Sequence, residues 1–314
     1  MKRVLVLLST YNGEDFLGIQ LRSLYNQEGI DIHILVRDDG STDSTTTILN
    51  QFCKEYGKMT ILKEKNVGPA LSFYLLLKKA WDDFCDYDYY AFCDQDDEWD
   101  SNKLFSGVEK LEQSDNPFKF YGCKFRVIDA NGIVIENCSP TFQEPNYKNC
   151  LFRNPTPGCS QIFSRGLLER SIDIFKYIES ADFSKTYLHL HDVWTINLAC
   201  YLDAYIYIDK RPLFSYRQHS SNVTIYSEKS YLRRYKGVVN DLKRTPQKYS
   251  HGAKILLDLE KGIIGNEKIK YLQMVADYRK TFISTFCFAV KYPWVHKQLY
   301  VKVYAFISII FRLF

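Results

Sequence analysis

Between residues 4 and 93 the chain alternates short apolar runs with segments whose apolar residues recur at helical spacing, and this order constrains the fold most strongly. The apolar runs, typical of strands covered on both faces, are residues 4–8, 32–36, 59–62 and 89–93. The intervening segments with helical spacing are residues 16–24, 44–56 and 70–83. This alternation predicts an α/β fold, with a Rossmann-like, mostly parallel sheet, right-handed crossovers and helices on both faces.

Polar residues follow four of the predicted strands at the point where each strand ends. Ligands of parallel sheets bind at the carboxyl ends of strands, so these residues are expected to form one site. They are Thr10, Tyr11, Asn12, Asp38, Asp39, Asn66, Gly68, Asp94, Gln95 and Asp96. Neither glycine-rich phosphate fingerprint, G-x-x-x-x-G-K-[ST] or G-x-G-x-x-G, is present. Phosphates at this site would therefore be neutralised by a metal ion held on the acids.

The run of acids at 94–97 directly follows an aromatic, apolar strand. Like charges packed together repel unless a positive charge joins them, and an oxygen-only ligand set suits Mg²⁺ or Mn²⁺. The alternative is a solvated acidic loop before a helix that begins near Ser101, since acids are common near helix N-termini. In either case we expect Asp97 and Glu98 to be helix-start acids and not metal ligands.

After residue 100 the pattern becomes less regular. A helix is predicted over 100–113, and the Asn131-Gly132 pair predicts a hairpin between strands 118–129 and 133–136. Further strands are predicted at 160–163, 205–209 and 213–216, and further helices at 167–174 and from His191 to about Leu202.

Charge divides the chain near residue 228. From Lys229 onward there are 17 Lys/Arg and 5 Asp/Glu, a net charge of +12, whereas residues 1–228 carry −8. We therefore predict a first domain over 1–228, divided near residue 115, and a basic, aromatic-rich helical region over 229–314. Helical patterns at 281–290 and 299–313 suit an anionic membrane surface, and simple packing onto the first domain is the alternative.

Composition excludes several classes. Nine cysteines without a C-x-x-C pair indicate reduced thiols and a cytosolic protein, and not a zinc site. The N-terminal apolar run is interpreted as a first strand and not a signal peptide, and no apolar stretch reaches the ~20 residues needed to span a bilayer. The basic region would attract phosphates, but no nucleic-acid-binding module is visible.

Six motifs together resemble family 2 glycosyltransferases, in particular the bacterial rhamnosyltransferase-like branch. In chain order they are Ser-Thr-Tyr-Asn-Gly-Glu at 9–14, Asp-Asp-Gly-Ser-Thr-Asp at 38–43, Asn-x-Gly at 66–68, Asp-Gln-Asp-Asp-Glu-Trp at 94–99, His-Asp-x-Trp at 191–194 and Tyr-Arg-Gln-His-x-x-Asn at 216–222. The resemblance covers about residues 3–224. It implies a GT-A type fold and inverting transfer from a nucleotide-diphosphate sugar.

On the donor side, the resemblance assigns roles to the residues at the strand ends. It implies that the nucleoside pocket is lined by Thr10, Tyr11, Asn12 and Glu14, with Asp39 on the base or ribose and Asp38 supporting the turn. Asn66 and Gly68 would shape the nucleotide wall. Asp94 and Asp96 match the family's Asp-x-Asp around Gln95, with Asp96 as the direct ligand of Mg²⁺ or Mn²⁺. His219 is an added candidate for metal or diphosphate, or a structural residue.

On the acceptor side, Asp192 matches the family's catalytic base, at a position where many members read Glu-Asp and this chain reads His-Asp. An N-cap role for Asp192 is the alternative. Neighbouring residues assigned to the acceptor side are Trp99, Gly158, Cys159, His191 and Trp194. Packing is the favoured role for Trp194, no reaction is required of Cys159, and His191 would position Asp192. The region that reads Gln-x-x-Arg-Trp in processive synthases differs here, which indicates one sugar per event.

The expected function is transfer of one sugar to a hydroxyl of a cell-surface glycan or lipid-linked acceptor. The candidate donor is dTDP-L-rhamnose, with a UDP-hexose as the alternative. A catalytically idle nucleotide-sugar binder docked on a membrane is an alternative of another class. The expected location is the cytoplasm or the inner face of the cytoplasmic membrane.

Overall fold

The computed structural model describes residues 1–139, 144–152, 156–178, 190–220, 222, 248–259 and 262–291. The chain separates into two compact units. The first comprises Met1–Glu144, Asn154–Ile172 and Leu190–Thr224, and the second comprises Pro145–Arg153, Asp173–His189 and Ile225–Phe314. The boundary expected at residue 228 and the helix expected at 299–313 lie outside the described residues.

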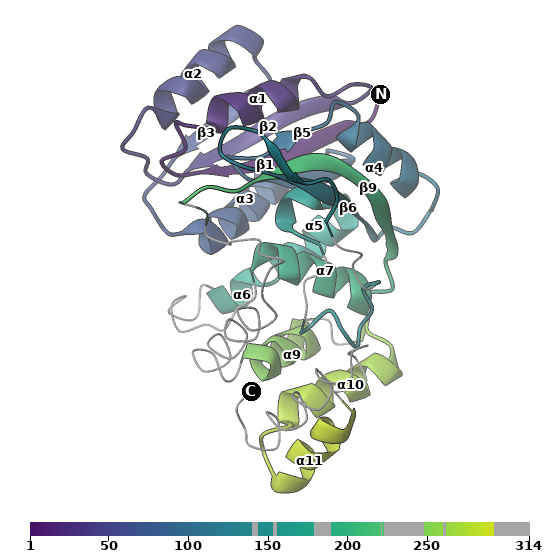
Figure 1. Ribbon diagram of the computed structural model, residues 1–314. Helices are drawn as coiled ribbons and strands as arrows, with labels where there is room; N and C mark the ends of the chain where they lie inside the picture. Colours follow the sequence, from purple (N-terminus) through teal and green to yellow (C-terminus); the bar gives the residue numbers. More distant parts are fainter. Residues whose placement is uncertain are drawn as a thin grey trace. The chain divides into compact units, whose positions relative to one another are not determined.

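One nine-stranded sheet organises the first unit, in the order β3-β2-β1-β4-β8-β6-β9-β5, with β7 paired to β6 (Figure 1). The strands are β1 (Arg3–Thr10), β2 (Asp31–Asp38), β3 (Met59–Lys63), β4 (Tyr89–Cys93), β5 (Glu98–Trp99), β6 (Lys119–Ile128), β7 (Val134–Glu136), β8 (Ile162–Ser164) and β9 (Tyr205–Arg217). The strands from β3 to β4 are parallel to their neighbours, as the alternating pattern predicts. The strand β8 is antiparallel to both β4 and β6, so the sheet is mixed beyond β4.

Helices cover both faces of this sheet. They are α1 (Leu17–Tyr25), α2 (Thr45–Tyr56), α3 (Pro69–Phe84), α4 (Lys103–Leu111), α5 (Arg165–Ile172) and α7 (His191–Tyr201), with a short 3₁₀ turn η1 (Gly158–Ser160). Figure 1 shows α1 and α2 on one face and α3 and α5 on the other, where α7 packs against α3 and α5. The central strand β1 is buried on both faces, with Val4, Leu5 and Leu8 fully inaccessible to solvent. The fold is α/β with a mostly parallel first half of the sheet and helices on both faces, as expected.

Two local features differ from the sequence predictions. The strands expected at 205–209 and 213–216 form one continuous strand, β9, because its pairing with β6 continues through an irregular register opposite Lys124. The helix expected from residue 100 begins at Lys103, because Glu98 and Trp99 pair with Ser215 and Phe214 of β9 instead.

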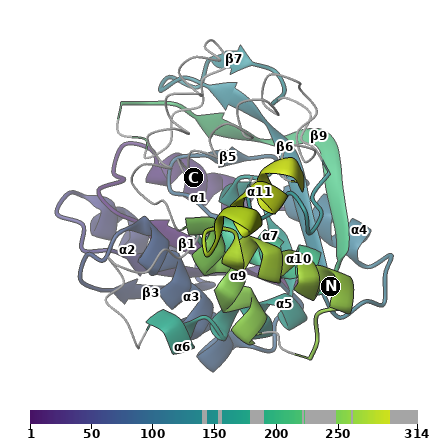
Figure 2. The same cartoon turned by 90° about the horizontal axis from the view of Figure 1, so that it is seen from below.

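The regular secondary structure described in the second unit is helical. It contains α6 (Phe175–Ile178), α9 (Lys248–Leu259), α10 (Asn266–Asp277) and α11 (Phe282–Lys291), and α10 contacts both α9 and α11 (Figure 2). Its core contains Leu256, Leu272 and Tyr278. No helix in the described ranges has the length and apolar character required to cross a membrane.

Candidate active site

The carboxyl ends of β1, β2 and β4 meet, and side chains from each bind the loops of the others. Thr10 Oγ1 donates to Asp38 Oδ1 (3.1 Å). Gln95 accepts from the Tyr11 amide (2.8 Å) and donates to its carbonyl (3.1 Å). Asn12, with φ of 46°, accepts through Oδ1 from the Thr42 amide (2.9 Å). The polar edge expected from the sequence therefore exists as one connected network.

Glu14 joins the same network through its carboxylate, which accepts from the Ser44 amide (2.8 Å). Ser44 is the residue before α2, and Asp43 in turn accepts from the Glu14 amide (3.1 Å). Glu14 thus fixes the loop after β1 to the start of α2. The Tyr11 side chain on this edge is half exposed (47%).

Asp39 is buried (2% exposed) and organises the loop before α3. Its carboxylate pairs with the buried guanidinium of Arg37 and accepts from the amides of Val67 (2.9 Å) and Gly68 (2.9 Å). Gly68 has φ of +83°, a conformation that favours glycine, and directly precedes Pro69 at the start of α3. The adjoining Asn66 side chain is exposed. Asp39 therefore supports the wall that Asn66 and Gly68 present.

The acids after β4 lie close together, and their negative charges repel one another. Burial, and then the charges of Asp96 and Asp192, raise the pKa of Asp94 to about 7. Asp97 is fully buried, and burial followed by the charges of Asp96 and Asp94 raises its pKa well above the usual range. The expectation that Asp97 and Glu98 are helix-start acids is wrong, because α4 begins only at Lys103. Glu98 lies in β5, and the Asp97 carboxylate accepts from the Arg217 amide (3.2 Å).

His219 lies directly against this cluster. Its Nε2 is 2.9 Å from Asp96 Oδ2, and Asn222 Nδ2 approaches the same oxygen at 3.4 Å. The His219 ring also packs on Phe16, with centroids 4.7 Å apart. The segment that follows β9 therefore delivers His219 to Asp96, the pair expected to hold the metal.

The acid cluster suits a divalent cation. Within the described residues no Lys or Arg pairs with the carboxylate of Asp94 or Asp96, and Asp96 is approached by the imidazole of His219 and the amide of Asn222. Carboxylate oxygens with one imidazole are ligands that Mn²⁺ and Mg²⁺ accept. Among the described residues, potential metal-ligand atoms of Asp94, Asp97 and Cys159 also lie within 4.8 Å of one another. The sequence did not suggest this set.

Asp192 lies in the first turn of α7 and is 9% exposed. Leu190, and not Asp192, occupies the N-cap position, so the N-cap alternative is wrong. The Asp192 carboxylate accepts from the Val193 amide (2.8 Å), and its charge acts on Asp94 and on Tyr74 of α3, whose pKa is raised first by burial and then by Asp192. The segment near residue 192 therefore reaches the acid cluster after β4.

His191 is held by aromatic packing. Its ring stacks on Phe73 (centroids 3.8 Å apart) and meets Phe92 edge-on (4.5 Å). Burial lowers its pKa to about 3, so the ring is neutral near pH 7. A Cβ at Gly158 would lie 3.0 Å from His191 Nε2 and 3.3 Å from Asp192 Cβ, so this glycine allows η1 to pack against the start of α7.

The remaining acceptor-side candidates are buried. Trp194 is 1% exposed, and Trp99 is 4% exposed with the ammonium of Lys103 over its ring. Neither ring presents a face to solvent on which a sugar could stack, and we place both in packing roles. Cys159 is also buried, and burial together with Asp97 and Asp94 raises the pKa of its thiol well above the usual range, which favours an unreactive thiol.

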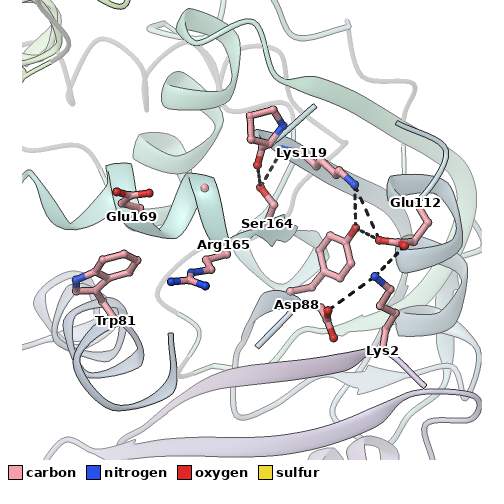
Figure 3. Close-up of a pocket in the computed structure, with 11 residues that line it drawn as sticks. Lys2, Trp81, Asp88, Glu112, Lys119, Ser164, Arg165 and Glu169 are labelled. Carbon is pink, nitrogen blue, oxygen red and sulfur yellow. Dashed lines mark hydrogen bonds and ion pairs between the residues drawn. The ribbon is translucent and has the colours of Figure 1, made fainter. Parts of the chain in front are cut away.

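A pocket of about 450 Å³ lies elsewhere, near the amino ends of β1, β4 and β6 (Figure 3). Its charged groups largely satisfy one another: Lys2 pairs with Glu112 (2.9 Å), which also accepts from the Tyr89 hydroxyl (2.5 Å). Because ligands of parallel sheets bind at the opposite ends of the strands, we do not assign the donor to this pocket.

The model of the family described as "Glycosyl transferase family 2" matches residues 5–173, more than half of the chain. The chain is a family 2 glycosyltransferase. Among curated relatives, it is 31% identical over 219 residues to the dTDP-rhamnosyl transferase RfbG of Shigella flexneri, covering 68% of this chain and 72% of that one. It is 27% identical over 157 residues to the putative teichuronic acid biosynthesis glycosyltransferase TuaG of Bacillus subtilis, covering 50% and 59%.

Solved glycosyltransferases share the fold. A structure of S. aureus TarS 1–349 in complex with UDP-GlcNAc superposes with a TM-score of 0.55 at 16% identity, covering 99% of this chain and 90% of that one. The mannosyltransferase PcManGT from Pyrobaculum calidifontis, in complex with GDP-Man and Mn²⁺, gives a TM-score of 0.52 at 17% identity, covering 96% and 73%.

Sequence reasoning missed one further residue beside this candidate site, Arg217. It is 2% exposed at the end of β9, and its Nε donates to the Asp96 carbonyl (3.0 Å) while its amide donates to Asp97. Arg217 therefore shapes the loop that carries the acids. The sequence signal for Arg217 was its position in the Tyr-Arg-Gln-His motif. Its burial was not expected, because arginine is mostly exposed in folded proteins.

Proposed function

We propose that this glycosyltransferase moves one sugar, with inversion, from a nucleotide-diphosphate sugar to an acceptor hydroxyl. The observation that carries the proposal is the electrostatic contact between Asp192 and Asp94, which brings the candidate base next to the donor-side acids. A base must lie opposite the leaving group, and it comes here from a segment separate from the acids.

In this proposal different residues bind the nucleoside, remove the acceptor proton and hold the cation. The loops at the ends of β1, β2 and β3 bind the nucleoside, with Tyr11 exposed to it and Asp39 fixing the Gly68 wall. Asp192 takes the proton of the acceptor hydroxyl. Asp94 and Asp96, with His219, hold a divalent cation, which when bound offsets the charge of the departing diphosphate.

For the donor we propose dTDP-L-rhamnose, and for the acceptor a cell-surface or lipid-linked glycan. Similarity to RfbG supports the rhamnosyl donor, and similarity to TuaG supports an envelope glycan. The alternative donor is a UDP-hexose. A panel of nucleotide sugars, compared by calorimetry and by release of the nucleoside diphosphate, separates these donors from an idle binder, which would bind without release.

The test of the base is Asp192→Asn. We expect diphosphate release to fall by about 10²–10⁴-fold, because loss of general base catalysis has this magnitude, while calorimetric donor affinity stays nearly unchanged. Asp82→Asn is the matched control, since Asp82 pairs with Lys78 on the surface of α3. Retained turnover in Asp192→Asn would remove Asp192 from the mechanism.

We further propose that the second unit contacts an anionic membrane surface from the cytoplasmic side. Four apolar side chains of α11 are exposed: Phe282, Ile283, Phe286 and Val290. Together with the basic charge from Lys229 onward, this combination suits shallow insertion beside anionic headgroups.

The membrane proposal predicts sedimentation of the chain with phosphatidylglycerol vesicles and not with phosphatidylcholine vesicles. The double variant Phe282→Ser/Ile283→Ser should lose most of this binding, because these side chains are 67% and 74% exposed and can be replaced without opening a core. Equal sedimentation of variant and wild type would show that α11 is not the contact.

A further inference from the structure

The pocket near the amino ends of β1, β4 and β6 has two unlike sides (Figure 3). On one side Lys2 pairs with Glu112, within a network of ion pairs and hydrogen bonds. On the other side lie Trp81 of α3 and two side chains of α5, Arg165 and Glu169. Within the described part of the chain, none of these three forms a hydrogen bond or an ion pair. This side of the pocket therefore keeps its polar groups available to a ligand.

The packing of α5 sets the positions of these side chains. The helix contacts α3, and a Cβ at its residue Gly166 would lie 2.6 Å from the Pro117 carbonyl oxygen, so glycine allows α5 to begin against the segment before β6. Arg165 and Glu169 are four residues apart and so lie on one face of the helix. The guanidinium carbon of Arg165 is 6.0 Å from the centre of the Trp81 ring, at the outer limit of a cation–π contact. Trp81 is only partly buried and keeps surface for a ligand.

The charges that line the pocket indicate which kind of ligand it would take. Three lining side chains are basic and three are acidic, so the lining has no net formal charge and favours neither an anion nor a cation. Trp81 offers an apolar surface, Arg165 offers N–H donors and Glu169 offers oxygen acceptors. An uncharged sugar uses all three, because its ring has faces of C–H bonds and its hydroxyl groups both donate and accept. A volume of about 450 Å³ is within the range of pockets that bind small molecules.

We propose that Trp81, Arg165 and Glu169 form a non-catalytic binding site for an uncharged sugar unit of a glycan. The site lies at the opposite end of the sheet from the candidate carboxylates. Strand β1, with 8 residues, spans roughly 25 Å of this separation at a rise of about 3.3 Å per residue. One sugar cannot contact both places, so a ligand that uses both is a chain of several sugars. That the chain is the acceptor rests on the proposed function; binding of a sugar here does not.

The test follows the indole N–H signals of the full chain labelled with ¹⁵N-tryptophan, which contains four tryptophans. The signal that is missing from Trp81→Phe belongs to Trp81. Methyl α-L-rhamnoside and methyl α-D-glucoside are the uncharged probes, and D-glucuronate and D-glucosamine are the charged ones. We expect an uncharged probe to shift the Trp81 signal at lower concentration than either charged sugar. A preference for a charged sugar, or no shift with either uncharged probe, would overturn the proposal.

Variants of the two polar side chains are read by the same signal. Arg165→Met and Glu169→Ala should each weaken binding of the uncharged probe by roughly three- to tenfold, the effect of losing one hydrogen bond. Both side chains are exposed, so these variants open no core. The matched control is Asp82→Asn, next to Trp81 on α3 but outside the pocket, which should bind as wild type. Unchanged affinity in either pocket variant would overturn the site.

Turnover tests the link to the acceptor. Glu169→Ala should raise the KM for an acceptor of many sugars, leave the KM for an acceptor of one sugar unchanged, and leave kcat unchanged for both. Equal KM changes for the two acceptors would overturn the acceptor-holding role. Asp192→Asn should bind the uncharged probe at Trp81 as wild type does, so failure of the Asp192 test and failure of this proposal are distinguishable.

Discussion

Two sides of the candidate site differ in how their polar groups are satisfied: the loops at the ends of β1, β2 and β3, proposed to bind the nucleoside, and the acids after β4. On the nucleoside side, the side chains of Thr10, Asn12, Glu14 and Asp39 bind neighbouring loops, so the wall is complete without a ligand. On the acid side, burial and then the charges of Asp96 and Asp192 raise the pKa of Asp94 to about 7, and buried polar atoms of Asp97 and His191 lack hydrogen-bond partners within the described structure. The first side is therefore preorganised, whereas the second keeps unbalanced charge, as the proposed cation site requires.

The largest effect is expected where the preorganised side is broken. Arg37→Met leaves the Asp39 carboxylate buried without its guanidinium, so the free energy of unfolding should fall by about 3–5 kcal/mol, the cost of removing one partner of a buried pair. Urea unfolding measures this loss. The control is Lys58→Met, which breaks the exposed pair with Asp31 and should cost less than about 1 kcal/mol.

On the acid side a substitution should stabilise the fold. The folded-state pKa of Asp94 is raised to about 7 from its usual 3.8, so ionisation opposes folding increasingly as pH rises through this interval. Without metal, Asp94→Asn should therefore melt above wild type at pH 8, and the difference should shrink at pH 5. Melting curves in chelator at the two pH values measure this change; a difference independent of pH would contradict it.

The smallest expected effect is the gain from a bound cation. At pH 8, Mn²⁺ at 100 times its Kd should stabilise the wild type by about 2.7 kcal/mol, because a ligand bound only to the folded state shifts the equilibrium. Asp96→Asn should remove most of this gain, while Asp82→Asn should keep it. An equal shift in all three proteins would place the ion elsewhere.

The alternating pattern was enough to predict the parallel strands and the convergence of their ends, because both follow from local periodicity and the handedness of crossovers. The pattern could not predict which of the adjacent acids Asp96 and Asp97 is buried. Adjacent acids look alike in a sequence, and which of them is buried depends on η1 and β9, which come much later in the chain. The burial of Lys103 was equally hidden, since lysine is almost never fully buried unless paired.

The continuity of strand β9 limits where this enzyme tolerates an insertion or a deletion. Its irregular pairing with β6 near Lys124 sets the position of everything that follows, including Arg217 and His219 at the acids. Side chains along a strand alternate between faces, so one residue inserted or deleted at 210–212 would turn Arg217 away from the Asp96 loop. We therefore expect an insertion or deletion at 210–212, in the irregular part of the pairing, to inactivate the enzyme as a substitution of the candidate carboxylates would.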